Sequence, residues 1–186
     1  MQALLARKNF KGYLIAATNV LDDLKSKHDL EAAKQMLDEV LENTSHVQQY
    51  SKRGQLFEER YDLAVETRDS PELARSFLER SIQHYAQLNG SPQELQALIK
   101  LSQLNDKEGR SEENIELYER GLQSAYLPQQ RQMLLATMAS ELERDGNNDE
   151  AQVVRARLQR QQEIDEQPFS LKVSQDRFGN INLESD

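Results

Sequence analysis

The sequence predicts an all-α fold of about four helix pairs arranged as a repeat, with a short extended or β-hairpin tail. Three observations support this prediction. Apolar residues recur with helical spacing, proline and glycine stand at intervals beside turn-forming residues, and one pattern of small and apolar residues returns about every 40 residues. The chain of 186 residues is long enough to bury a core without disulfides.

The spacing of apolar residues defines the helices. Ile99, Leu101 and Leu104 follow helical spacing in one segment, and Tyr118 and Leu122 continue it in the next. Neither segment alternates as a strand does. The predicted helices span residues 3–26, 29–43, 46–68, 71–88, 92–107, 111–125, 128–145 and 148–165.

Turn-forming residues separate these helices. Ser-Pro pairs at 70–71 and 91–92 combine an N-cap with a proline at the first helical position, where its missing N–H is harmless. Gly109 and Gly146 stand where a preceding helix can end in a left-handed residue. These signals divide the chain into helical hairpins.

The second helix of each pair shares one pattern. A small or short residue opens the pattern, at Ala33, Ala74, Asn114 and Ala151. An apolar residue follows one turn later in three pairs, at Leu37, Leu78 and Tyr118, and Arg155 departs from this pattern in the fourth. The opening positions are separated by 41, 40 and 37 residues, which favours stacked helix pairs that cannot bury their apolar faces alone.

Over residues 3–165 the chain resembles the tetratricopeptide-repeat family, whose signature combines Trp, Leu-Gly and Tyr with Ala, Phe and Pro. In the third pair these places hold Leu98, Leu101-Ser102, Asn105, Asn114 and Tyr118, with Pro128 two residues late. Hydrophobic character is retained, but the glycine is not. The period exceeds the family's usual length of about 34 residues, so the first helices would be extended. A closed antiparallel bundle is the alternative fold.

The resemblance implies a concave groove, lined by the first helix of each pair, that binds an extended peptide or a helix. The predicted partner-binding residues occupy the family's inward positions. They are Asp22, Leu56, Glu59, Leu63, Glu66, Gln96, Ile99, Gln103, Asp106, Met133 and Glu143. The same carry-over places Ile15, Thr18, Ala136 and Ser140 in the groove.

The groove charges are mainly acidic, which favours a partner segment with basic or neutral residues beside apolar anchors. Asp22 matches a place where some members of the family hold a peptide's terminal carboxylate, and its charge would repel that group. We therefore predict no carboxylate clamp of that type. A merely solvated acidic helix face is the alternative interpretation.

Composition argues against several other functions. The net charge of -9 repels nucleic acid, and Arg7, Lys8 and Lys11 interrupt the only apolar run near the N-terminus, so membrane insertion is not expected. The chain has no cysteine, its three histidines lie in different segments, and no phosphate loop or Gly-x-Ser-x-Gly motif occurs. We predict no catalytic residue, no cofactor and no metal. A cytoplasmic location is favoured, and a periplasmic one stays open if the chain is a processed or excised fragment.

The last residues change in character. Apolar and polar residues alternate around 169–173 and again at 181–183, and residues 176–180 form a candidate loop, which predicts either a small hairpin or an extended, disordered tail. Such a hairpin would either cap the last helix pair or act as a partner-binding or domain-swapped strand. The predicted division is a helical repeat domain at 1–165 and a tail at 166–186.

The sequence therefore favours a protein-interaction scaffold or adaptor without chemistry of its own. The alternative is a structural protein that self-assembles through its terminal hairpins, so a homo-oligomer stays open. An enzyme with an unrecognised pocket ranks third.

Overall fold

The computed structural model describes residues 1–88, 91–125, 127–166, 171–175 and 181–185. These residues form two compact units, Met1–Leu134 and Leu135–Asp186. The helices run α1 (Gln2–Ala6), α2 (Phe10–Ser26), α3 (Leu30–Asn43), α4 (Tyr50–Glu66), α5 (Pro71–Ala86), α6 (Pro92–Glu108), a 3-10 turn η1 (Ser111–Glu113), α7 (Asn114–Ser124), α8 (Pro128–Arg144) and α9 (Asn148–Glu166). The boundary between the units lies within α8, and the predicted boundary near residue 166 stays a prediction.

The predicted helix 3–26 is wrong in one respect, because the structure divides it into α1 and α2. Lys8 adopts a left-handed conformation with φ of 54°, which no helix interior accepts. Asn9 then caps α2, and its Oδ1 accepts a hydrogen bond from the Gly12 N–H at 3.0 Å. The apolar spacing continues across the break, so periodicity alone does not reveal it.

The fourth helix begins at Tyr50, four residues after the predicted start at 46. The preceding residues form a turn in which the Val47 N–H donates to the Thr44 carbonyl at 2.9 Å. Arg53 holds this turn, because its Nη1 donates to the carbonyls of Thr44 and Ser45 at 2.6 and 2.7 Å. A side chain from the next helix thus satisfies carbonyls that the end of α3 leaves open.

The predicted turn signals are confirmed at several helix ends. Ser70 caps α5, and its hydroxyl accepts from the Leu73 N–H at 3.2 Å, with Pro71 in the first position. Gly109 and Gly146 have positive φ, of 71° and 83°, as expected for left-handed residues after a helix. Ser91 precedes α6 but donates to Gln93 Oε1 at 2.7 Å and makes no capping bond.

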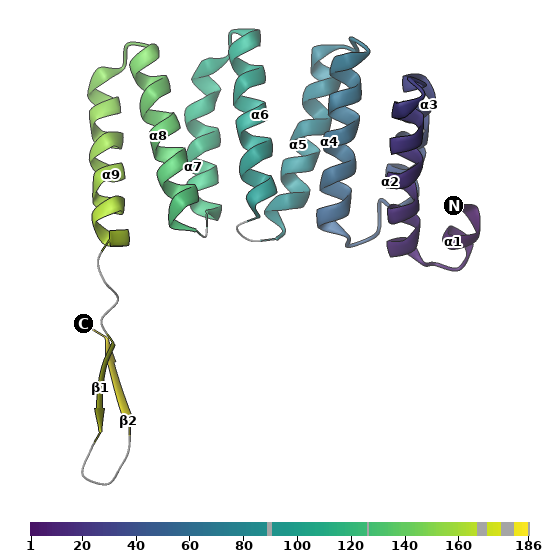
Figure 1. The fold of residues 1–186 in the computed structure, drawn as a ribbon. Helices are drawn as coiled ribbons and strands as arrows, with labels where there is room; N and C mark the ends of the chain where they lie inside the picture. Colours follow the sequence, from purple (N-terminus) through teal and green to yellow (C-terminus); the bar gives the residue numbers. More distant parts are fainter. Residues whose placement is uncertain (89–90, 126, 167–170, 176–180, 186) are drawn as a thin grey trace. The chain divides into compact units, whose positions relative to one another are not determined.

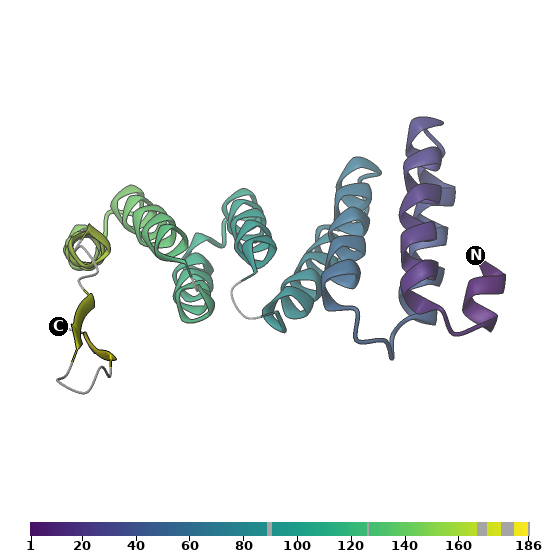
Figure 2. The same ribbon diagram turned by 60° about the horizontal axis from the view of Figure 1, so that its bottom comes forward.

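In the first unit, each helix from α2 to α6 packs against the next helix of the chain, and Figure 1 and Figure 2 show α2 to α7 side by side in chain order. Among the described residues, α2 also contacts α4, but far less than each helix contacts its neighbour in the chain. A closed bundle would bring non-consecutive helices together around one centre. The first unit is therefore a repeat of helical hairpins.

The repeated pattern forms the core of these hairpins. Ala33, Leu37, Leu78 and Tyr118 are completely buried. Asn114 is also buried at a position where the other pairs have alanine, and its side chain is fully engaged. Its Oδ1 accepts from Asn105 Nδ2 at 2.8 Å, and its Nδ2 donates to Asp106 Oδ1 at 3.0 Å and to the Ser102 carbonyl at 3.3 Å. These bonds explain how a polar residue occupies this core position.

The tail contains the expected hairpin. Strand β1 (Leu171–Gln175) pairs antiparallel with β2 (Ile181–Ser185), and Val173 lies opposite Leu183. The predicted loop at 176–180 lies outside the described residues. Among those residues, no helix combines the length and apolar character that crossing a membrane requires.

Candidate functional site

Three ion pairs join the first helices of successive hairpins. Lys25 of α2 lies 2.8 Å from a Glu59 oxygen on α4, and Lys100 of α6 lies 2.8 Å from Glu58 and 3.7 Å from Asp62, both on α4. These contacts place one side of α2, α4 and α6 on a common surface. We call it the first-helix face and define it by these five residues together with the exposed Asp22 and Glu66, which lie about one helical turn from Lys25 and Asp62.

The predicted site residues divide into three groups. Asp22, Glu66, Gln96 and Gln103 are exposed, and Glu59, Ile99 and Asp106 are half-buried. Leu56 and Leu63 are instead buried, with exposed fractions of 1% and 0%, and they belong to the core shared by the first two hairpins. A buried leucine offers no surface to a partner, so the structure gives these two residues a packing role.

Asp106, Met133 and Glu143 are not among the residues that define the first-helix face. Asp106 accepts a hydrogen bond from Asn114 of α7, which directs its carboxylate toward the second helix of its own hairpin. Met133 is exposed near the end of the first unit. Glu143 lies in the second unit, where its two oxygens accept from Arg155 at 2.6 and 2.7 Å.

The sequence prediction missed four members of the first-helix face, namely Lys25, Glu58, Asp62 and Lys100. Lys25 and Glu59 are 34 residues apart, and Lys100 and Glu58 are 42 residues apart. One available signal is the spacing of Glu59, Asp62 and Glu66, which puts three carboxylates on one side of α4. The choice of partners across helices requires the tertiary structure.

The lysines of this face already have counter-ions. The hydrogen bond to Glu59 raises the pKa of Lys25, against the opposing effect of burial. Burial lowers the pKa of Lys100, but the carboxylates of Glu58 and Asp62 outweigh it and the net direction is upward. Both ammonium groups are therefore charged and engaged at neutral pH.

Carboxylates remain in excess on this face. Asp22 and Glu66 are exposed and have no cation within ion-pair distance among the described residues. Burial raises the pKa of Asp62, Lys100 lowers it, and the neighbouring Glu59 and Glu58 raise it further. Lys52, two turns before Glu59, donates to Gln55 at 3.0 Å and offsets part of this charge. The described side chains of this face therefore carry a net negative charge.

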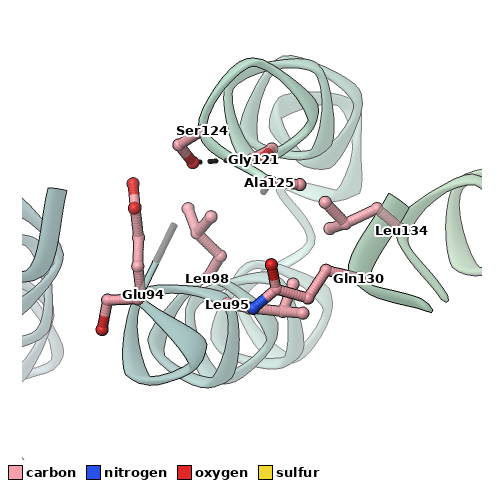
Figure 3. A pocket seen from close by; sticks show the side chains of 9 residues that line it. Glu94, Leu95, Leu98, Gly121, Ser124, Ala125, Gln130 and Leu134 are labelled. Atoms are coloured by element: carbon pink, nitrogen blue, oxygen red, sulfur yellow. Dashed lines mark hydrogen bonds between the residues drawn. The ribbon is translucent and has the colours of Figure 1, made fainter. Parts of the chain in front are cut away.

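A separate cavity lies where α6, α7 and the start of α8 meet (Figure 3). Its volume is ≈ 10 Å³, and its lining includes Glu94, Ser124, Gln130 and the apolar side chain of Leu98. A space of this size holds about one water molecule. Glu94 is 1% exposed, and neither of its oxygens has a hydrogen-bond partner. The cavity is too small for an organic substrate.

Within the described ranges, no group of three or more His, Asp or Glu side chains is arranged to hold a metal ion. The predictions that the chain has no cofactor and no catalytic residue stay predictions.

Comparisons with known proteins identify the fold. A crystal structure of nearly identical TPR-like repeats from a putative kinesin light chain of Podosopora anserina is similar over 83% of this chain and 77% of its own, with 15% identity and a TM-score of 0.55. A single-substitution variant of that protein aligns with a TM-score of 0.54 at 16% identity, covering 80% of this chain and 74% of its own.

The crystal structure of MamA is similar over 88% of this chain and 94% of its own, with 17% identity and a TM-score of 0.50. No family model and no curated protein matches the sequence. At these identities the likeness concerns the fold alone, and it agrees with the neighbour-to-neighbour packing of the hairpins. The chain is a TPR-like helical repeat protein in fold.

Proposed function

We propose that the chain is a protein-interaction scaffold that binds a basic or neutral segment of a partner along the first-helix face. The observation that carries this proposal is the excess of exposed carboxylates beside two lysines that are already paired. A scaffold of this kind needs no catalytic group, because recognition depends on surface shape and charge.

Charge and apolar contacts both support a peptide ligand. Asp22 and Glu66 offer unpaired carboxylates, while Ile15 on α2 is 45% exposed and Ile99 on α6 is half-buried. Complementary charges raise the association rate and select the partner, and apolar anchors supply affinity. The preferred ligand is therefore a segment that combines lysine or arginine with apolar side chains.

The first prediction concerns the charges of this face. A double variant, Asp22→Lys and Glu66→Lys, removes two attractive carboxylates and introduces repulsion, while leaving the ion pairs of Lys25 and Lys100 intact. Binding of a labelled peptide of alternating lysine and leucine should weaken by about tenfold or more, equivalent to about 1.4 kcal/mol. Fluorescence anisotropy at two salt concentrations measures this change, and added salt should reduce the difference.

A matched control separates position from net charge. The variant Glu79→Lys with Glu112→Lys carries the same charge change on α5 and η1, away from the first-helix face, and should bind almost as the unaltered chain does. Proteins captured from a lysate by the three forms extend the comparison to natural partners. Equal loss of binding in both double variants, or no loss in either, contradicts the proposal.

Self-association is the second candidate function, and one observation favours it. Val153 and Ile164 on α9 are 63% and 56% exposed and lie three helical turns apart on the same side. Exposed apolar side chains in register on one helix are typical of helix pairing. A second copy of the chain would cover them.

A further inference from the structure

A second open surface lies on the second helices of the first two hairpins. A cleft of ≈ 370 Å³ opens between α3, α4 and α5, with a floor formed by Leu41, Phe57 and Phe77. We call it the second-helix cleft and define it by this floor together with Arg53, Arg80 and Glu42. Its volume suits one or two large side chains of a ligand.

Arg53 in this cleft is a buried cation without a counter-ion. Only 5% of the residue is exposed, its Nη1 donates to the two carbonyls at the end of α3, and its Nε has no acceptor. No carboxylate among the described residues forms an ion pair with it, and burial lowers the pKa of its guanidinium without any opposing acid. A buried charge that lacks a partner costs stability.

The other buried arginines differ in this respect. Arg60, 4% exposed, donates to Asp38 at 2.8 Å and to Asp69 at 3.3 Å. Arg75, 8% exposed, is paired with Glu108 and lies 3.7 Å from Glu113. A chain of net charge -9 has ample carboxylates for this purpose. The missing counter-ion of Arg53 is therefore specific to the cleft.

A second guanidinium faces the same aromatic ring. Arg53 and Arg80 lie 5.8 and 5.9 Å from the centre of the Phe57 ring. Arg80 is exposed and forms no ion pair with a described residue. His84 stacks on Phe57 at 5.3 Å, and burial together with the charge of Arg53 lowers its pKa, so it is neutral at pH 7. Two cations thus flank an apolar floor.

The acids of the cleft lie on its α3 wall. Asp38 is engaged, because both of its oxygens accept hydrogen bonds from Arg60. Glu42 is exposed and has no ion pair with a described residue. Its carboxylate disfavours an anion near it, but it can accept backbone N–H groups of a chain that continues past the floor.

We propose that the second-helix cleft binds an acidic segment of another polypeptide, in which an aspartate or glutamate lies beside a large apolar residue. The carboxylate binds between Arg53 and Arg80, and the apolar side chain contacts Phe57 and Phe77. Glu42 accepts N–H groups of the ligand chain where it continues past the floor. Because the ligand chain continues there, the carboxylate that binds the arginines belongs to a side chain within the segment. This site has the opposite charge preference to the first-helix face and does not depend on the function proposed there.

The test uses two matched peptides, acetyl-Gly-Phe-Asp-Gly-Gly-amide and its isostere with Asn in place of Asp. Chemical shifts of the arginine Nε–Hε groups report the site, and a titration gives the affinity. The Asp peptide should bind about tenfold more tightly than the Asn peptide and should shift the signals of Arg53 and Arg80. Equal affinities, or no shift at either arginine, overturn the proposal.

Two substitutions at exposed residues should change the affinity for the Asp peptide in opposite directions. Arg80→Gln should weaken binding of this peptide by about fivefold, because it removes an attractive charge. Glu42→Gln should strengthen binding by about twofold to threefold, because it removes a repulsive charge. Arg120→Gln, one hairpin along on α7, is the matched control and should change nothing. Failure of either effect overturns the proposal. Tighter binding of acetyl-Gly-Gly-Phe with a free terminal carboxylate than of the Asp peptide also overturns it, because that result would assign the anion to a chain end.

Discussion

At the scale of single residues, Glu94 is the most deeply buried carboxylate among the described residues. It lies on α6 beside a cavity that is too small for more than a water molecule. Burial raises its pKa, and the nearby Ser124 hydroxyl and Arg120 guanidinium oppose the shift only in part. The folded protein therefore binds a proton at Glu94 more tightly than the unfolded chain does.

This raised pKa predicts the effect of Glu94→Gln. With a raised folded pKa, the contribution of Glu94 to stability is fully present below its unfolded pKa of about 4.3 and is lost as the pH rises through the folded pKa. The uncharged glutamine should therefore increase the free energy of unfolding by about 1–2 kcal/mol at pH 7 and by almost nothing near pH 4.

Urea denaturation of both proteins at the two pH values measures the difference. The exposed substitution Glu66→Gln is the control and should give little change at either pH. A gain for Glu94→Gln of the same size at pH 4 and pH 7 would contradict the assigned protonation.

At the scale of elements, α4 and α5 approach each other closely at Gly54. A Cβ built on this residue would lie 2.6 Å from Tyr85 Cε1 and 2.8 Å from Cδ1, closer than real contacts allow. Tyr85 is 2% exposed, and its hydroxyl donates to Glu58 at 2.8 Å, so the ring cannot easily move away. The missing side chain at Gly54 sets how near these two helices come.

Replacement of Gly54 by alanine sets two effects against each other. Alanine favours a helix interior over glycine by about 1 kcal/mol. Overpacking against a fixed ring costs about 1–3 kcal/mol. We expect the steric effect to prevail, so that Gly54→Ala lowers the melting temperature.

Differential scanning calorimetry tests this prediction. Ser51→Ala, on the exposed side of the same helix, is the control and should leave the melting temperature unchanged or raise it slightly. A higher melting temperature for Gly54→Ala would mean that Tyr85 relocates without cost.

The helix boundaries also show which features local sequence patterns can predict. Apolar spacing and Ser-Pro or glycine signals located most boundaries within a few residues, because a helix end depends on hydrogen bonds within one turn. The break at Lys8 was missed, since the apolar pattern continues from α1 into α2. The helix α4 begins later than predicted, and Arg53 binds carbonyls at the end of the preceding helix. No local sequence pattern indicates this contact.

At the scale of the whole molecule, packing between neighbours leaves both terminal faces of a repeat in need of cover. On α9, the buried side is formed by Ala151 and Val154, while Val153 and Ile164 are exposed. If a second copy covers this exposed face, the two copies would pair through the same residues around a twofold axis.

Self-association predicts a mass that depends on concentration. Size-exclusion chromatography with light scattering should give a mass approaching twice 21.5 kDa as the concentration rises. Val153→Glu should return the chain to a monomer, because it places a charge in the apolar contact. Gln152→Glu carries the same charge change at an adjacent exposed position and should have a weaker effect. A constant mass of one chain excludes this candidate.

By itself the sequence determined the helical class, the pairing of helices and the return of one pattern about every 40 residues. These features depend on spacing and hydrogen bonds between residues close in the chain. Only the tertiary structure decided that Leu56 and Leu63 belong to the core, that Lys25 pairs with Glu59, and that Arg53 faces a cleft without a counter-ion. Burial and ion pairing depend on which side of a helix its neighbours cover, and those neighbours lie tens of residues away in the chain.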